Sequence, residues 1–211
     1  MTGHIALLGD SIFDNARYVG GEADVITHLR ALLTPGWKAS LLAVDGSTIA
    51  DLESQLSKVS ADVTHVVISL GGNDVILSSD LLGLPVSSTA QALAIFGERV
   101  GQFEAAYRAA IDAALKLARN TTICTIYNGN LAQAEAMLAR VGLTIFNDAI
   151  LRVAFERRLP VIDLRLICAE PADYANPIEP SGRGGQKIAA AIARALGLKE
   201  GESRNSCVYA G

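Results

Sequence analysis

Short apolar runs alternate with longer amphipathic segments along this chain. The apolar runs, rich in β-branched residues, predict strands over residues 5–8, 40–44, 65–70, 121–127 and 160–164. Helical periodicity covers residues 24–33, 48–56, 90–119 with at least one break, 132–158 and 185–196. Because parallel strands need a crossover, which is usually a helix, this alternation predicts an α/β fold. We expect a three-layer α/β/α sandwich with a flavodoxin-like parallel sheet of five strands.

The chain shows no internal repeat and no low-complexity linker. Half of its 211 residues are hydrophobic, which is enough to bury one sizeable core. We therefore expect a single domain over residues 1–198. Residues 199–211 are polar and contain Gly and Ser, so we expect a loosely ordered tail there.

Charge and composition argue against several classes of partner. The chain carries 18 Lys and Arg against 22 Asp and Glu, a net charge of −4, which disfavours nucleic acid. No apolar stretch reaches the roughly 18 residues that span a membrane. The N-terminal residues lack the basic lead and cleavage site of a secretion signal, which indicates a cytoplasmic protein.

The sequence predicts neither a cofactor nor a metal, because no His, Cys and Asp cluster has the spacing of metal ligands. The three cysteines, Cys124, Cys168 and Cys207, are odd in number and far apart, so we expect free thiols, the first two in or beside the core.

Polar and glycine-rich motifs follow the predicted strands. Gly9-Asp10-Ser11 follows the first strand, Asp45-Gly46-Ser47 the second and Gly71-Gly72-Asn73-Asp74 the third, while a loop ending at Ser181 follows the fifth. Ligands bind beyond the carboxyl ends of the strands in open parallel sheets, so these loops are expected to meet at one edge. A Gly-Asp-Ser turn alone often only caps a helix. Together, however, the N–H groups of Ser11 and Gly46 and the amide of Asn73 could surround a developing oxyanion.

These motifs, together with Pro180-Ser181, make the chain resemble the SGNH or GDSL-type hydrolases over nearly its whole length. The resemblance implies that Ser11 is the nucleophile and that Ser11, Gly46 and Asn73 form the oxyanion hole. It also implies a small ester or acyl substrate.

The last motif departs from that family's pattern, which has an Asp, two residues, and then a His followed by Pro. The register set by Pro180-Ser181 places Asn176 at the Asp position and Glu179 at the His position. Both partners of the serine are therefore replaced.

No other histidine is well placed to act as the base. His4 and His65 begin strands whose far ends carry Ser11 and Asn73, roughly 15–20 Å away. His28 falls within the first helix. A carboxylate is left as the partner: Glu179, or one of Asp10, Asp14, Asp74 and Asp173. Its ordinary pKa of about 4.3 makes it a weak base unless burial or a second carboxylate raises that value.

The favoured hypothesis is a serine ester hydrolase with Ser11 as nucleophile and Glu179 as a non-standard base. Candidates for substrate contact are Asp10, Asp14, Asp74 and Asn176, although Asp14 and Asp74 could instead cap a helix or hold a loop. Arg183 could pair with Glu179 and keep it ionised. The alternative is a scaffold that has lost catalysis and binds a small ligand in the same cleft. A nucleotide-binding module is less favoured, because no G-x-G-x-x-G or P-loop motif is present.

Overall fold

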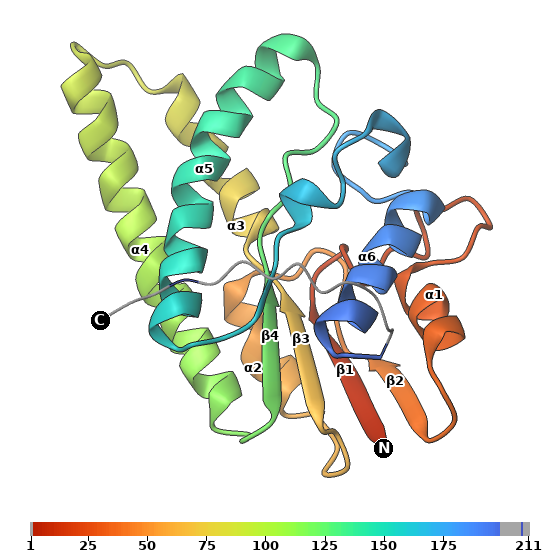
Figure 1. Ribbon diagram of the computed structural model, residues 1–211. Coiled ribbons are helices and arrows are strands. Elements are labelled where there is room, and N and C mark those ends of the chain that lie inside the picture. Colours follow the sequence, from red (N-terminus) through yellow and green to blue (C-terminus); the bar gives the residue numbers. More distant parts are fainter. Residues whose placement is uncertain (1, 199–207, 209–211) are drawn as a thin grey trace.

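The computed structural model describes residues 2–198 and 208 (Figure 1). Apart from Val208, the tail expected at residues 199–211 lies outside the described residues. No helix within the described part of the chain is long and apolar enough to cross a membrane.

The sheet has five parallel strands in the order β2-β1-β3-β4-β5, as the alternation of elements predicted. The strands are β1 (Gly3–Gly9), β2 (Trp37–Leu41), β3 (His65–Ser69), β4 (Asn120–Cys124) and β5 (Val161–Ile162). The expected start of the second strand, at residue 40, was wrong by three residues. The N–H groups of Leu42 and Ala43 both donate to the carbonyl of Leu7, which ends the regular ladder there.

Two layers of helices cover the sheet, so the three-layer prediction is confirmed (Figure 1). One layer contains α1 (Val25–Leu32) and α6 (Gly182–Ala195), and the other contains α2 (Leu52–Leu56), α4 (Thr89–Leu115) and α5 (Gln133–Glu156). Single 3₁₀ turns are η1 (Ile49–Asp51), η3 (Leu164–Leu166) and η4 (Pro171–Asp173).

Two features of the helices differ from the prediction. The break expected within residues 90–119 is absent, and α4 continues through the exposed Gly97 and Gly101. A glycine inside a helix costs only about 1 kcal/mol relative to alanine, which is not enough to end this long helix. The Gly-Gly-Asn-Asp motif is the start of a helix, α3 (Gly72–Leu77), which leads into the 3₁₀ helix η2 (Ser78–Gly83).

Successive residues of β1 contact opposite layers, which explains its uninterrupted apolar run. Ile5 and Leu7 pack with α1 and α6, whereas Ala6 and Leu8 pack with α2, α4 and α5. The helices α4 and α5 extend beyond the carboxyl ends of the strands (Figure 1). They form a wall above the sheet edge where the candidate residues lie.

Gly9, the last residue of β1, has a conformation that only glycine adopts easily. Its φ is +132°, and a Cβ atom there would lie 1.7 Å from the carbonyl oxygen of Ser69. Its N–H donates to Oε1 of the buried Gln55 at 2.7 Å, and its carbonyl accepts from Nε2 of the same side chain at 2.8 Å. Gly9 therefore fixes how β1 passes into the turn that carries Ser11.

We expect Gly9→Ala to lower the free energy of unfolding by at least about 3 kcal/mol, because β1 and β3 would have to separate. The matched control is Gly20→Ala, at φ +59° with no other atom within 4 Å of the added Cβ. It should cost only about 1 kcal/mol of backbone strain. Urea unfolding measures both values, and equal losses would contradict the close-approach argument.

Candidate active site

The loops predicted to meet do so at the carboxyl ends of β1, β2 and β3. Ser11 lies two residues after β1, Gly46 lies in the loop after β2, and Asn73 is the second residue of α3. The strand order reverses between β1 and β3, which is where open α/β sheets bind their ligands.

Ser11 and Glu179 form a direct hydrogen bond. The Ser11 hydroxyl donates to Oε1 of Glu179 at 3.0 Å, and the two residues are only 8% and 5% exposed. Burial raises the pKa of Glu179 to about 7, the Asp45 carboxylate adds to this, and the Ser11 hydrogen bond and Arg17 oppose it. Glu179 is thus a much stronger proton acceptor than an ordinary glutamate.

A tight turn holds the backbone of Glu179. The side-chain oxygen of Asn176 accepts from the N–H groups of Ile178 and Glu179, both at 2.9 Å. The N–H of Ala175 donates to the Glu179 carbonyl at 2.9 Å. Asn176 therefore supports Glu179 through the main chain, from the position that carries an Asp in the family pattern.

Asn15 fastens this turn to the Ser11 loop. It is fully buried, and its amide donates to the carbonyl of Pro180 at 3.2 Å while its side-chain oxygen accepts from the N–H of Val25 at 3.0 Å. Neither Asn15 nor Asp14, which the sequence offered as a possible cap, caps the first helix, because the cap is Asp24. Nothing in the local sequence distinguishes this bridging role from a cap, because Pro180 is 165 residues away.

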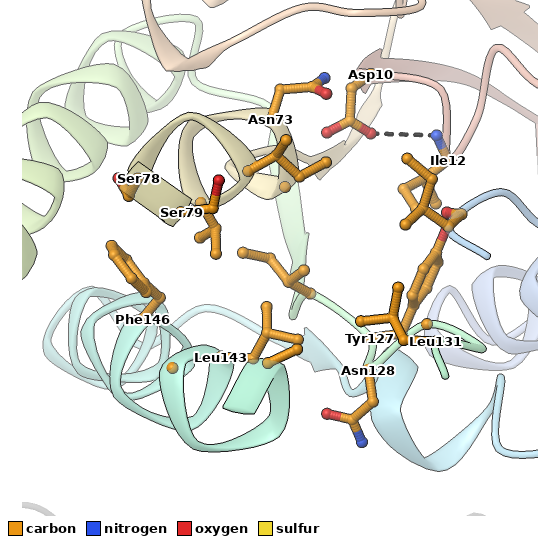
Figure 2. Close-up of a pocket in the computed structure, with 18 of the residues that line it drawn as sticks. Asp10, Ile12, Asn73, Ser78, Ser79, Tyr127, Asn128, Leu131, Leu143 and Phe146 are labelled. Carbon is orange, nitrogen blue, oxygen red and sulfur yellow. Dashed lines mark hydrogen bonds between the residues drawn. The ribbon is translucent and has the colours of Figure 1, made fainter. Parts of the chain in front are cut away.

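Asp10 is a second buried carboxyl group in the site. Its Oδ1 accepts from the N–H of Ile12 at 3.1 Å, the contact marked in Figure 2. Burial raises the pKa of Asp10 to about 7, and the charges of Glu179 and Asp74 contribute in the same direction. Two carboxyl groups with pKa values near neutrality therefore lie in one site.

Two of the three candidate oxyanion donors, Ser11 and Gly46, lie in loops, and Asn73 lies in the first turn of α3. The Asn73 amide donates to the carbonyl of Ser47 at 2.9 Å, and the Ser47 hydroxyl accepts from Gln55 at 3.1 Å. Gly46 has a φ of +81°, in the left-handed region. Asn73 lines the cavity beside Ser11, whereas Gly46 does not.

The remaining candidate carboxylates hold loops. Asp14 accepts from the N–H of Asp45 at 2.9 Å, and Asp74 accepts from the N–H of Ile49 at 3.1 Å. Asp173 is buried and pairs with Lys187. None of Asp14, Asp74 and Asp173 lines the cavity beside Ser11, and neither does Asn176.

Arg183 does not pair with Glu179, contrary to expectation. Its guanidinium contacts Glu170 and Asp173, on the far side of the turn. Arg183 therefore does not hold the pKa of Glu179 down, and Arg17 opposes its rise only in part.

The histidines lie away from Ser11. His4 and His65 lie at the N-terminal ends of β1 and β3, and His28 packs beside Gly185 of α6. His4 does contact a serine and an aspartate, with Nε2 2.7 Å from Ser40 Oγ and Nδ1 3.0 Å from Asp62 Oδ2. Neither Ser40 nor Asp62 lines the cavity beside Ser11.

A cavity of about 350 Å³ opens beside Ser11 and runs between α3 and α5. Figure 2 shows Asp10 and Asn73 on one side of it and Leu143 and Phe146 across from them. Within residues 2–198 and 208, no group of three or more His, Cys, Asp or Glu side chains is arranged to hold a metal ion.

The strand order, the helix layers and a serine at the end of β1 define the fold class of the SGNH hydrolases. The model of the GDSL-like lipase/acylhydrolase family matches residues 7–187, and the chain belongs to that family.

Solved structures of hydrolases share this fold. An α/β hydrolase from the metagenome of Lake Arreo, Spain, is 21% identical with a TM-score of 0.70, over 94% of this chain and 97% of its own. An acetylxylan esterase from Geobacillus stearothermophilus is 20% identical with a TM-score of 0.67, over 96% and 97%. An extracellular lipase from Streptomyces rimosus is 16% identical with a TM-score of 0.66, over 92% and 100%. No curated protein sequence matches the chain.

Replacing Asn15 tests how the Glu179 turn is held. We expect Asn15→Ala to lower the free energy of unfolding by about 1–3 kcal/mol, because it leaves the buried Val25 N–H and Pro180 carbonyl unpaired. The control is Asn128→Ala, whose side chain lines the cavity and makes no hydrogen bond to any described residue. It should change stability by less than about 0.5 kcal/mol. Similar losses in thermal or urea unfolding would refute the bridging role.

Proposed function

We propose that this protein is a serine hydrolase for small ester or acyl substrates, in which Ser11 is the nucleophile and Glu179 replaces histidine as the general base. The observation that carries the proposal is the buried hydrogen bond between these two side chains. A base works best when its pKa lies near the working pH, and burial raises the pKa of Glu179 to about 7.

The proposed reaction has two steps, acylation of Ser11 and hydrolysis of the acyl-enzyme. Ser11 Oγ attacks the substrate carbonyl carbon while its proton passes to Glu179, and the protonated Glu179 then gives that proton to the departing alcohol. Water then attacks the acyl carbon while it loses a proton to Glu179, and Glu179 returns that proton to Ser11 Oγ as the bond between Oγ and the acyl carbon breaks and the acid leaves. In each step Glu179 thus accepts one proton and then gives it up.

In this proposal Ser11, Gly46 and Asn73 supply the hydrogen-bond donors that stabilise the oxyanion formed in each step. No acceptor within the described part of the chain takes a hydrogen bond from the main-chain N–H of Ser11 or of Gly46. The Asn73 amide has a second hydrogen beyond the one donated to Ser47. Such donors act strongly in a site that excludes water.

Family membership supports the ester class. The structural neighbours include an acetylxylan esterase and a lipase. The proposal for this chain is limited to a small ester or acyl compound that fits the cavity beside Ser11.

Activity should depend on the ionisation of Glu179. With p-nitrophenyl acetate and butyrate we expect kcat/KM to rise between pH 6 and 8 with a midpoint near 7, because the base must lose its proton before it can accept one from Ser11. Ser11→Ala should reduce turnover to the uncatalysed rate. Glu179→Gln should lower kcat/KM by about 10²–10⁴-fold and remove the pH dependence.

The control variant is Ser40→Ala, which removes the serine that contacts His4. It should leave the hydrolysis rate unchanged, and a loss comparable to that of Ser11→Ala would place the nucleophile elsewhere.

A second candidate function is a scaffold that binds a ligand in the same cleft without turnover. It is favoured by the replacement of both family partners of the serine, at Asn176 and Glu179. If the parent protein is inactive while Asn176→Asp/Glu179→His hydrolyses the esters, then the oxyanion donors are competent and the natural protein is a binding scaffold.

A further inference from the structure

The cavity beside Ser11 has apolar walls and an acidic end. Its volume of about 350 Å³ lies within the range of small-molecule sites, about 300–1,000 Å³. Val75 and Ile76 of α3, Phe96 of α4, and Leu143 and Phe146 of α5 contribute to the walls. Such walls suit an unbranched aliphatic chain.

Every charged side chain that lines this cavity is acidic. Asp10 and Glu179 lie at the Ser11 end and Glu135 lies in the first turn of α5, while no Lys, Arg or His of the described residues lines it. A ligand with an anionic head would bring a further negative charge to two buried carboxyl groups. A cationic head would meet charges of the opposite sign in surroundings that screen them weakly.

One oxygen of the buried Glu179 carboxyl group is without a partner, and the Asp10 carboxyl group lines the same cavity. Glu179 Oε1 accepts from Ser11, but Oε2 is buried and has no hydrogen-bond partner among the described residues. Asp10 Oδ1 accepts from the N–H of Ile12, and no described residue donates to Oδ2. An unpaired buried polar atom is costly, so Glu179 Oε2 favours a ligand that donates a hydrogen bond.

We propose that this cavity is a binding site for primary alkylammonium amphiphiles, with the ammonium group donating to Glu179 Oε2 and Asp10 Oδ2 and the alkyl chain lying along the apolar walls. An ammonium group has three donors and no acceptor, which matches the unpaired Glu179 Oε2 and the Asp10 carboxyl group that lines the same cavity. This is a binding property of the cavity and does not require that Ser11 turn over any ester.

Binding of a cation should be linked to the ionisation of the two carboxyl groups. Burial raises the pKa of both Asp10 and Glu179 to about 7, and a bound ammonium would lower both values by favouring the charged forms. Affinity should therefore rise from pH 6 to 8, and binding at pH 7 should release protons.

The tyrosine, cysteine and arginine side chains near Asp10 and Glu179 do not change charge between pH 6 and 8. The titratable and charged groups that face the two carboxyl groups are Arg17, Tyr18, Asp45, Asp74, Cys124 and Tyr127. The pKa values of Cys124, Tyr18 and Tyr127 are raised above their ordinary values, and that of Arg17 is raised as well, so none of them changes charge between pH 6 and 8.

Isothermal titration calorimetry with three eight-carbon probes tests the proposal directly. Octylamine, octanol and octanoate are titrated below their micelle concentrations into the parent protein at pH 7.5, in two buffers of different ionisation enthalpy. Octylammonium should bind at least tenfold more tightly than octanoate, with proton release revealed by the buffer dependence. Hexylamine should bind about tenfold more weakly than octylamine, at about three- to fourfold per methylene.

Variants separate the two ends of the site. Glu179→Gln and Asp10→Asn should each weaken octylammonium at least tenfold while leaving octanol unchanged, and retained octanol binding shows that the variant has folded with its cavity intact. The control is Glu135→Gln, which removes the exposed carboxyl group in the first turn of α5 and should change affinity less than twofold.

The alkyl end is tested by filling the cavity. Gly142 lines it, and no other atom lies within 4 Å of a Cβ added there, so Gly142→Phe should place a ring in the cavity and abolish binding of octylamine and octanol. Gly101→Phe is the matched control, because Gly101 is an exposed helical glycine with equally open surroundings outside this cavity. It should leave binding unchanged.

Equal affinity for octanoate and octylammonium, or octylammonium binding that survives Glu179→Gln, would overturn the proposal. Ser11→Ala should bind octylammonium at least as tightly as the parent. If Ser11→Ala loses ester hydrolysis but still binds octylammonium, the binding proposal holds independently of the hydrolase function. If the parent protein hydrolyses esters but does not bind octylammonium, only the hydrolase function is supported.

Discussion

The buried hydrogen bond between Ser11 and Glu179 joins two parts of the chain that are 168 residues apart in sequence. A carboxyl group accepts a proton from an alcohol only poorly in water, because solvation keeps its pKa low. Here burial removes that solvation and outweighs the opposing charge of Arg17, while Arg183 is engaged by Glu170 and Asp173. The chemistry of the site therefore depends on how tightly these two segments are held together.

Several hydrogen bonds hold the Ser11 segment and the Glu179 segment together. Gly9 and Gln55 fix the end of β1, and Asn15 ties the start of α1 to the carbonyl of Pro180. On the other side, the hydroxyl of Tyr127 donates to the carbonyl of Ile178. Each contact involves main-chain atoms, so the position of Glu179 is set by the backbone of its turn. A side chain of different chemistry could occupy the same place without rearranging the fold.

That view explains how a member of the GDSL-like family can carry a glutamate at the histidine position. Asn176 accepts two main-chain hydrogen bonds within the turn, a role that needs an oxygen acceptor and no charge. The buried pair Asp10 and Glu179 then concentrates negative charge at the end of an otherwise apolar cavity. The proposed proton transfer to Glu179 and the proposed selection of a cationic head group both rest on this one arrangement.

Local patterns in the sequence determined the class of fold and the location of the site. Alternating apolar runs and amphipathic segments are short-range signals, and they correctly indicated a parallel sheet between helix layers with its loops meeting beyond the strand ends. The motifs around Ser11 and Asn73 likewise indicated the family. Tertiary structure alone decided the register of β2, the continuity of α4, the bridging role of Asn15 and the cavity between α3 and α5. It also decided the pKa of Glu179, because desolvation depends on which distant segments surround a side chain, and no pattern within a few residues of position 179 records them.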